Sequence, residues 1–178
     1  MQVRYQQAAD RVLWQLRTQQ GELYAVWLTR RMLKQLWSPL TGMVTQASVV
    51  QLAPNATVLP EAREMMAQAA RIRPLANSDF STPFDTTPAA QPLGSEPLLP
   101  HAIDLAPGSD HQGLQMAVRE PSGRQITLQL SADLATAWMR LLEQAIAEAD
   151  WGLSPAAPAT AQAAPMGPAT PAPPTLLN

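Results

Sequence analysis

The sequence predicts an α+β fold in which two β-hairpin–helix (ββα) units form one antiparallel sheet covered by helices. Two stretches alternate apolar and other side chains with the period of a strand, and each turns at a glycine, Gly21 or Gly123. Each hairpin is followed by apolar residues at helical spacing. The length of 178 residues suits a single domain, which we expect over residues 1–153, followed by a disordered Ala/Pro-rich tail over residues 154–178.

The turn of the first hairpin predicts its register. Gln19-Gln20-Gly21 suits a three-residue loop with glycine in the left-handed conformation. This loop joins three apolar pairs on one face of the hairpin, namely Leu16 with Tyr24, Trp14 with Val26, and Val12 with Leu28. A uniformly apolar face is what a strand pair needs in order to pack on a core, so the pattern supports this register.

A helix is expected over residues 30–46, directly after the first hairpin. Thr29 is a suitable N-cap. The apolar stripe of the helix comprises Met32, Leu33, Leu36, Trp37 and Leu40. Because Pro39 has no backbone N–H, we expect it to kink the helix or to end it near Ser38.

The second unit repeats this order. The turn Pro121-Ser122-Gly123 pairs Leu114 with Leu130, Met116 with Leu128, and Val118 with Ile126. Ser131 is then the N-cap of a helix expected over residues 132–150. A constant offset of 102 residues aligns the turn, strands, cap and helix of the two units. This agreement indicates an internal duplication, and chance similarity of two hairpin–helix units is the alternative.

The chain between the two units contains an extra helix and a long irregular segment. Residues 60–73 have helical apolar spacing, and the side chains expected to face inward are Ala62, Met65, Met66, Ala69 and Ile72. Residues 74–100 are rich in proline and polar side chains, so we expect a long irregular loop. Its two phenylalanines, Phe80 and Phe84, indicate docking either on this protein's own core or on a partner. Residues 101–105 are expected to add a short edge strand.

Charge is distributed unevenly along the chain. Residues 1–40 carry six basic and two acidic side chains, whereas the remainder carries six arginines and twelve acidic residues. Arg30, Arg31 and Lys34 surround the start of the first helix, where positive side chains oppose the helix dipole. They indicate a site for phosphate, a nucleic-acid backbone or a partner's carboxylate. The alternative is that they pair with acidic residues of the same molecule.

The second face of the first hairpin is also partly apolar. It carries Leu13, Leu23 and Trp27 beside Arg17, and the predicted register pairs Leu13 with Trp27. A strand pair that is apolar on both faces is either covered twice or exposes a patch for binding. The cover is expected to be the chain's own loop or helix, a second subunit, or nucleic-acid bases stacked on Trp27.

No arrangement of catalytic or cofactor-binding residues stands out. Cysteine is absent, and none of the eight glycines lies in a phosphate-binding spacing. The spacing of His101, Asp104, Asp110 and His111 matches no metal site, so we expect no metal, no cofactor and no enzymatic activity. No apolar run reaches the roughly 18–20 residues of a membrane span. The N-terminus also lacks the apolar stretch of a signal peptide, so we expect a cytoplasmic protein without a membrane partner.

Two functions fit these features. The first is a non-catalytic protein–protein interaction or assembly module that forms homo-oligomers or holds another protein. Its apolar interface comprises Leu13, Leu23, Trp27, Phe80 and Phe84. Its partner- or anion-binding residues are Arg17, Trp27, Arg30, Arg31 and Lys34. The alternative is a nucleic-acid-binding protein with a basic and aromatic surface around Trp27, Arg30 and Arg31, whose binding would weaken with ionic strength.

Overall fold

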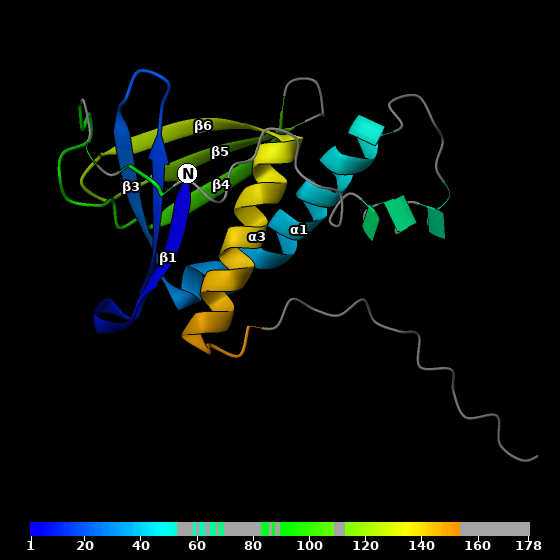
Figure 1. Cartoon of the computed structure of the whole chain (residues 1–178), viewed down its shortest axis with the longest axis horizontal. Coiled ribbons are helices and arrows are strands. Elements are labelled where there is room, and N and C mark those ends of the chain that lie inside the picture. Colours follow the sequence, from blue (N-terminus) through cyan, green and yellow to red (C-terminus); the bar gives the residue numbers. More distant parts are fainter. Residues whose placement is uncertain are drawn as a thin grey trace, which may run out of the picture.

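The computed structural model describes residues 1–52, 59, 61–62, 65–66, 68–69, 83–85, 87, 90–108 and 113–153. Within these residues the chain has an α+β fold with two three-stranded antiparallel sheets and two long helices (Figure 1). The expectation of one sheet is wrong, because each hairpin belongs to a sheet of its own. Phe80, Asp110, His111 and the tail over residues 154–178 lie outside the described residues.

Each sheet contains a third strand that precedes its hairpin. The first unit comprises β1 (Gln2–Gln6), a short 3-10 helix (Gln7–Ala9), β2 (Arg11–Arg17), β3 (Leu23–Leu28) and α1 (Arg30–Leu52). The second unit comprises β4 (Ala102–Pro107), β5 (Gly113–Arg119), β6 (Gln125–Ser131) and α3 (Ala132–Ala149). β4 confirms the expected edge strand, whereas β1 is a strand that the sequence pattern did not predict. Both units are therefore βββα rather than ββα.

The registers of both hairpins are those that the turns predict. The six apolar pairs form as expected: Val12–Leu28, Trp14–Val26, Leu16–Tyr24, Leu114–Leu130, Met116–Leu128 and Val118–Ile126. Gly21 and Gly123 have φ angles of 81° and 91°, the left-handed conformation that this loop requires. The N–H of Gly21 donates to the carbonyl of Thr18, and that of Gly123 donates to the carbonyl of Glu120, each at 3.0 Å.

Both long helices begin at the predicted caps. The Oγ1 of Thr29 accepts a hydrogen bond from the N–H of Met32 at 3.3 Å. The Oγ of Ser131 accepts one from the N–H of Leu134, also at 3.3 Å. Each side chain thereby satisfies one of the backbone donors that a helix start leaves without a partner inside the helix.

The length of α1 excludes one of the two effects expected of Pro39, an end near Ser38, and it exceeds the expected range of residues 30–46. α1 continues through Pro39 to Leu52. The proline removes the hydrogen bond to the carbonyl of Gln35, and a proline inside a helix costs about 3 kcal/mol. Leu40 and Val44, which follow the proline, are buried in the core. Because fully burying one such side chain contributes about 1.5–3 kcal/mol, packing offsets the cost of the proline.

The pairing within one unit coincides with the pairing within the other after a shift of 102 residues. Gln2 lies opposite Gln15 in the first sheet, and Asp104 lies opposite Ala117 in the second. The same shift relates the hairpin pairs, the turn glycines and the helix caps described above. The two units therefore share their topology and every observed register.

The inner faces of the sheets enclose one hydrophobic core together with α1 and α3 (Figure 1). The helices pack against each other, and each also packs against the first strand of the other unit, α1 against β4 and α3 against β1. Trp14 and Trp138 lie fully buried within this core, with ring centroids 4.6 Å apart. Neither indole N–H donates to any group in the described part of the chain.

The chain that follows α3 is fastened to the first unit. The indole N–H of Trp151 donates to the carboxylate of Asp10 at 2.8 Å, and the hydroxyl of Tyr5 donates to the same oxygen at 2.9 Å. The hydrogen bond from Trp151 and then that from Tyr5 lower the pKa of Asp10. The rings of Tyr5 and Trp151 also meet edge to face at 5.7 Å. These contacts hold the end of α3 against β1.

The extra helix between the units agrees only in part with the expectation over residues 60–73. The residues described there, 61–62, 65–66 and 68–69, are helical. However, Met65 is 72% exposed, and Ala62 and Ala69 are exposed as well, so these side chains do not face inward as expected. Met66 is half-buried, and Ile72 lies outside the described residues.

Candidate partner-binding groove

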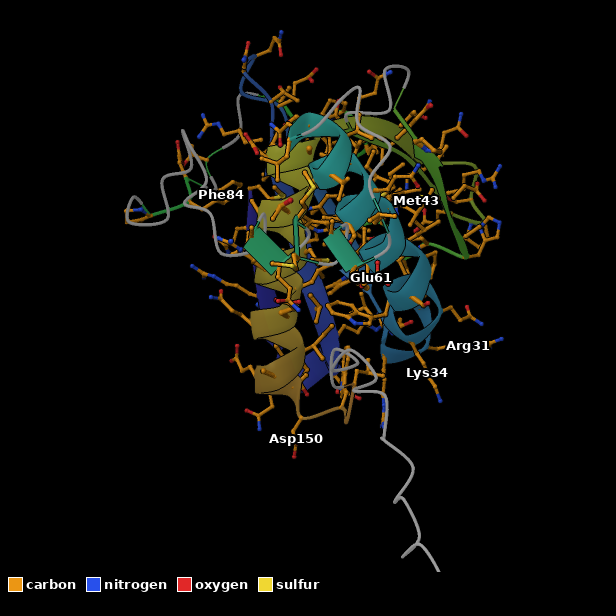
Figure 2. All side chains as sticks on the ribbon, turned by 90° about the vertical axis from the view of Figure 1, so that its right-hand side faces the viewer. Arg31, Lys34, Met43, Glu61, Phe84 and Asp150 are labelled. Atoms are coloured by element: carbon orange, nitrogen blue, oxygen red, sulfur yellow. The ribbon has the colours of Figure 1, made fainter. Side chains whose placement is uncertain are left out.

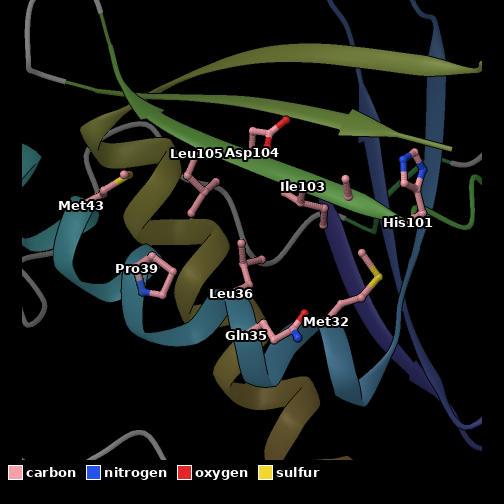
Figure 3. Close-up of a pocket in the computed structure, with 10 residues that line it drawn as sticks. Met32, Gln35, Leu36, Pro39, Met43, His101, Ile103, Asp104 and Leu105 are labelled. Carbon is pink, nitrogen blue, oxygen red and sulfur yellow. The ribbon is translucent and has the colours of Figure 1, made fainter.

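A groove of about 390 Å³ lies between the first half of α1 and the free edge of β4 (Figure 3). Seven apolar side chains line most of it: Met32, Leu36, Pro39 and Met43 from α1, and Ala102, Ile103 and Leu105 from β4. Two of the seven are methionines, whose flexible side chains adapt to differently shaped partners. The groove is therefore suited to hold apolar side chains.

The α1 wall of the groove differs in side-chain size from the equivalent positions of α3. The offset of 102 residues places Leu36 at the position of Trp138, and Pro39 at that of Leu141, so these two residues are smaller than their equivalents. Gln35 and Met43 are larger than theirs, which are Ala137 and Ala145. Trp138 is fully buried and packs on Trp14 of the first unit.

The backbone of β4 has hydrogen-bonding groups that point away from its sheet. β4 is an edge strand, and in the described residues no strand pairs with its other side. The N–H of Gly108, just after β4, donates to the carbonyl of Gly113 at 2.9 Å. Because antiparallel ladders alternate, the even-numbered residues of β4 bond to β5. Ile103 and Leu105 therefore direct their N–H and C=O groups to the free edge.

The polar residues around the groove do not close it. Asp104 points to the opposite side of the sheet from Ile103 and Leu105 (Figure 3), where it forms an ion pair with Arg119. His101 is exposed at the beginning of β4. The side chain of Gln35 is exposed on the α1 wall of the groove. Asp104 is therefore the one carboxylate among the described residues that border the groove, and Arg119 engages it.

Three exposed cations lie in the first turns of α1, near the end of the groove that Met32 lines, but none of them lines the groove itself. Arg30, Arg31 and Lys34 are exposed, and Figure 2 shows Arg31 and Lys34 projecting from the helix into solvent. Arg30 lowers the pKa of Asp10 slightly through its charge, although hydrogen bonds have the larger effect. No described carboxylate forms an ion pair with any of the three. Since the charge of Arg30 acts on the carboxyl of Asp10, neutralisation by acidic residues of the same molecule stays an alternative.

The outer face of the first hairpin forms a separate surface. Leu13 lies directly opposite Trp27, as the register predicts, and both side chains are half-buried. Leu23 is 7% exposed on the same face. None of the three belongs to the central core. The structure therefore brings Leu13 and Trp27 together, but on a different surface from the groove.

The free edge of β3 is occupied by residues 90–98, which we call the strap. The N–H of Leu23 donates to the carbonyl of Ala90 at 2.9 Å, and that of Trp27 donates to the carbonyl of Leu98 at 2.7 Å. Leu98 is 1% exposed and joins the core. The strap has no regular secondary structure beyond isolated bridges to β3, and through Leu98 it packs on the core of its own chain.

The strap is also held by the turn of the second hairpin. Arg124 donates to the carbonyls of Leu93 and Glu96 at 2.9 and 3.0 Å. Arg124 also forms an ion pair with Glu120, whose carboxylate accepts a hydrogen bond from the N–H of Leu99 at 2.9 Å. The hydrogen bonds from Arg124, then from Ser122 and Leu99, lower the pKa of Glu120 to about 2.

The low pKa of Glu120 predicts a specific acid dependence of stability. A carboxyl whose pKa is lower in the folded state than in the unfolded state stabilises the fold when it is ionised. This contribution is present above the ordinary pKa of 4.5 and is lost as the pH falls towards about 2. We expect the difference in free energy of unfolding between the native protein and Glu120→Gln to shrink across this interval. Urea titrations at several pH values measure it, and a constant difference would contradict the prediction.

Arg17 and Phe84 lie away from the start of α1. Arg17 forms an ion pair with Asp85, so this predicted site residue is engaged by its own chain. Figure 2 places Phe84 on one side of the view and Arg31 on the other. The structure therefore separates the predicted site residues into distinct surfaces, and Phe80 lies outside the described residues.

The groove itself is a site that the sequence did not predict. The apolar residues of α1 and the strand at residues 101–105 were both expected, but as separate core elements. Their juxtaposition depends on α1 crossing to the strand of the other unit, which no local pattern encodes.

Comparisons of this chain with protein-family models, curated proteins and solved structures found no match. In the described part of the chain, no helix has the length and apolar character needed to cross a membrane. The same residues contain no group of three or more His, Cys, Asp or Glu side chains placed to hold a metal ion. The interpretation of the groove therefore depends on its geometry and chemistry.

Proposed function

We propose that this protein is a non-catalytic interaction module that holds an extended segment of a partner protein in the groove between α1 and β4. The observation that supports the proposal is an apolar cavity beside a strand edge that is unpaired among the described residues. Extended segments add to such edges as an extra strand. Their alternate side chains then enter the adjacent pocket.

Backbone and side chains contribute to such binding in different ways. The outward N–H and C=O groups of Ile103 and Leu105 pair with the backbone of any extended segment. Side chains of the added strand that face α1 meet Met32, Leu36 and Met43. The backbone pairing supplies affinity, and the groove selects for apolar side chains of suitable size.

Nucleic-acid binding is the second candidate function. The exposure of Arg30 and Arg31, and the absence of ion pairs between them and described carboxylates, favours it. However, Trp27 is half-buried on the outer face of β3 with Leu13, rather than in the groove. We place this function second because its support is electrostatic only.

Substitutions on α1 test the proposed function. Short random peptides displayed on phage are selected on the full-length protein, and the enriched peptides are measured by fluorescence anisotropy. Gln35→Trp places an indole on the wall of the groove, so we expect it to weaken binding about tenfold, or about 1.4 kcal/mol. The matched variant Ser38→Trp adds the same side chain to an exposed position outside the lining and should bind like the native protein.

The outcomes of this experiment separate the candidate functions. Enriched peptides that bind both tryptophan variants equally well would show that the groove is not their site. Failure to enrich any peptide would also overturn the proposal. Size-exclusion chromatography with absorbance at 260 and 280 nm tests nucleic-acid binding. Nucleic acid that elutes with the protein at low salt should dissociate at high salt.

We further propose that the two βββα units arose by internal duplication. A single offset of 102 residues relates the strand pairs, the turn glycines and the helix caps of the two units, which supports this origin. The homo-oligomeric state and the cytoplasmic location expected from the sequence stay predictions. Light scattering of the purified full-length protein tests the oligomeric state.

A further inference from the structure

We infer that the partner segment contains alternating apolar residues followed by acidic residues, and that it runs antiparallel to β4. This inference rests on the proposed function and adds the chemistry and the direction of the ligand. It commits to a segment of a different protein, and it is argued from charge complementarity along the groove.

The two ends of the groove differ in charge. Met32 and His101 lie at one end, whereas Met43 and Leu105 lie at the other (Figure 3). The first end adjoins the start of α1, where Arg31 is exposed next to Met32 in the chain, whereas Arg30 and Lys34, each two residues from Met32, lie on the opposite face of the helix. The partial positive charge of a helix N-terminus adds to that of Arg31. An acidic group of the ligand is therefore stabilised at this end.

The length of chain that lines the groove determines how many apolar side chains of the ligand face α1. The lining of β4 extends from His101 to Leu105, four residue steps that span about 13 Å at 3.3 Å per residue. A strand of that length directs two or three side chains to one face. Because the α1 wall is mostly apolar, these side chains are expected to be apolar residues at alternate positions.

The direction of the ligand follows from the direction of β4. β4 begins at the cationic end, so a strand antiparallel to it ends there (Figure 3). Antiparallel pairing is slightly more stable per residue than parallel pairing, and every strand pair within the two sheets is antiparallel. Acidic residues should consequently follow the apolar ones in the ligand sequence.

A second copy of β4 fits this groove less well. In the symmetric antiparallel register that pairs Ile103 with Leu105, the two Asp104 residues face each other, each in an ion pair with its own Arg119, so these charges do not decide against the register. The residues that would reach the cationic end of the groove are Ala106 and Pro107, neither of which is acidic. A different protein is therefore the favoured occupant.

The test uses the peptides selected on the full-length protein, and it compares two charge reversals. Arg31→Glu reverses a charge at the cationic end of the groove, so we expect it to weaken binding about threefold to tenfold at low salt, with a smaller effect at high salt. Arg4→Glu makes the same change at an exposed position of β1, in the other sheet, and should leave binding unchanged. The selected sequences should also show the order of apolar then acidic residues.

Two results would overturn the inference without affecting the proposed function. In the first, the selected peptides lack acidic residues or carry them before the apolar positions, although Gln35→Trp still weakens their binding. The other is equal binding to Arg31→Glu and Arg4→Glu. If Gln35→Trp does not weaken the binding of the selected peptides, in contrast, the proposed function itself is overturned.

Discussion

Replacing Trp138 by alanine is expected to lower the free energy of unfolding by about 3–5 kcal/mol, the range for removing a large aromatic side chain from a core. Trp138 is fully buried on α3, and its ring lies 4.6 Å from that of Trp14 on β2. The substitution removes the contact between the second unit's helix and the first unit's sheet. Urea denaturation followed by circular dichroism measures the loss.

Trp138→Phe is the matched variant for this prediction. Phenylalanine keeps much of the packing and removes an indole N–H that has no partner among the described residues. A buried donor without a partner costs about 1–3 kcal/mol, so its removal offsets part of the lost packing. We expect a smaller loss than with alanine. Equal losses for both variants would contradict the assigned role of the ring.

Replacing Gly113 by alanine is expected to lower the free energy of unfolding by about 1–3 kcal/mol, the usual cost of overpacking. A Cβ at this position would lie 2.5 Å from the carbonyl oxygen of Leu130. Leu130 is in the neighbouring strand β6, so backbone must move to admit the methyl group. The requirement for glycine comes from this close approach of two strands at the start of β5.

Gly42→Ala is the control for the substitution at Gly113. Gly42 lies inside α1, and nothing lies within 4 Å of an added Cβ. Alanine should raise the free energy of unfolding by about 0.8–1 kcal/mol, because glycine is a poor helix former. Opposite signs at the two positions are therefore expected in the same denaturation assay. A stabilising effect at Gly113 would show that β5 and β6 are farther apart than the structure indicates.

The hairpins and caps could be predicted because their determinants are local. Gly21 and Gly123 adopt the left-handed conformation that a three-residue loop requires, and this loop length determines which residues face each other. Thr29 and Ser131 are followed by apolar residues at helical spacing, so the helix starts could be located to the residue. In each case the decisive interactions join residues that are close in sequence.

The remaining structure depends on contacts between distant parts of the chain. β1 has only five residues, and its partners become evident only once β2 is placed. The extension of α1 beyond residue 46 to Leu52 buries Ala47 and Val49, and local propensity does not include such packing. The groove requires knowledge that α1 packs against β4 rather than against its own sheet alone. None of these arrangements is encoded in a short sequence pattern.

The order of elements along the chain has a consequence for synthesis on the ribosome. β3 ends at Leu28, but Leu98, which completes its hydrogen bonding, is about 70 residues further on. At about 5–20 residues per second, the edge of β3 stays open for roughly 4–14 s after it emerges. An open strand edge is a template for pairing with neighbouring nascent chains. The yield of folded protein should therefore depend on translation speed between α1 and β4, and on chaperones that cover the emerging hairpin.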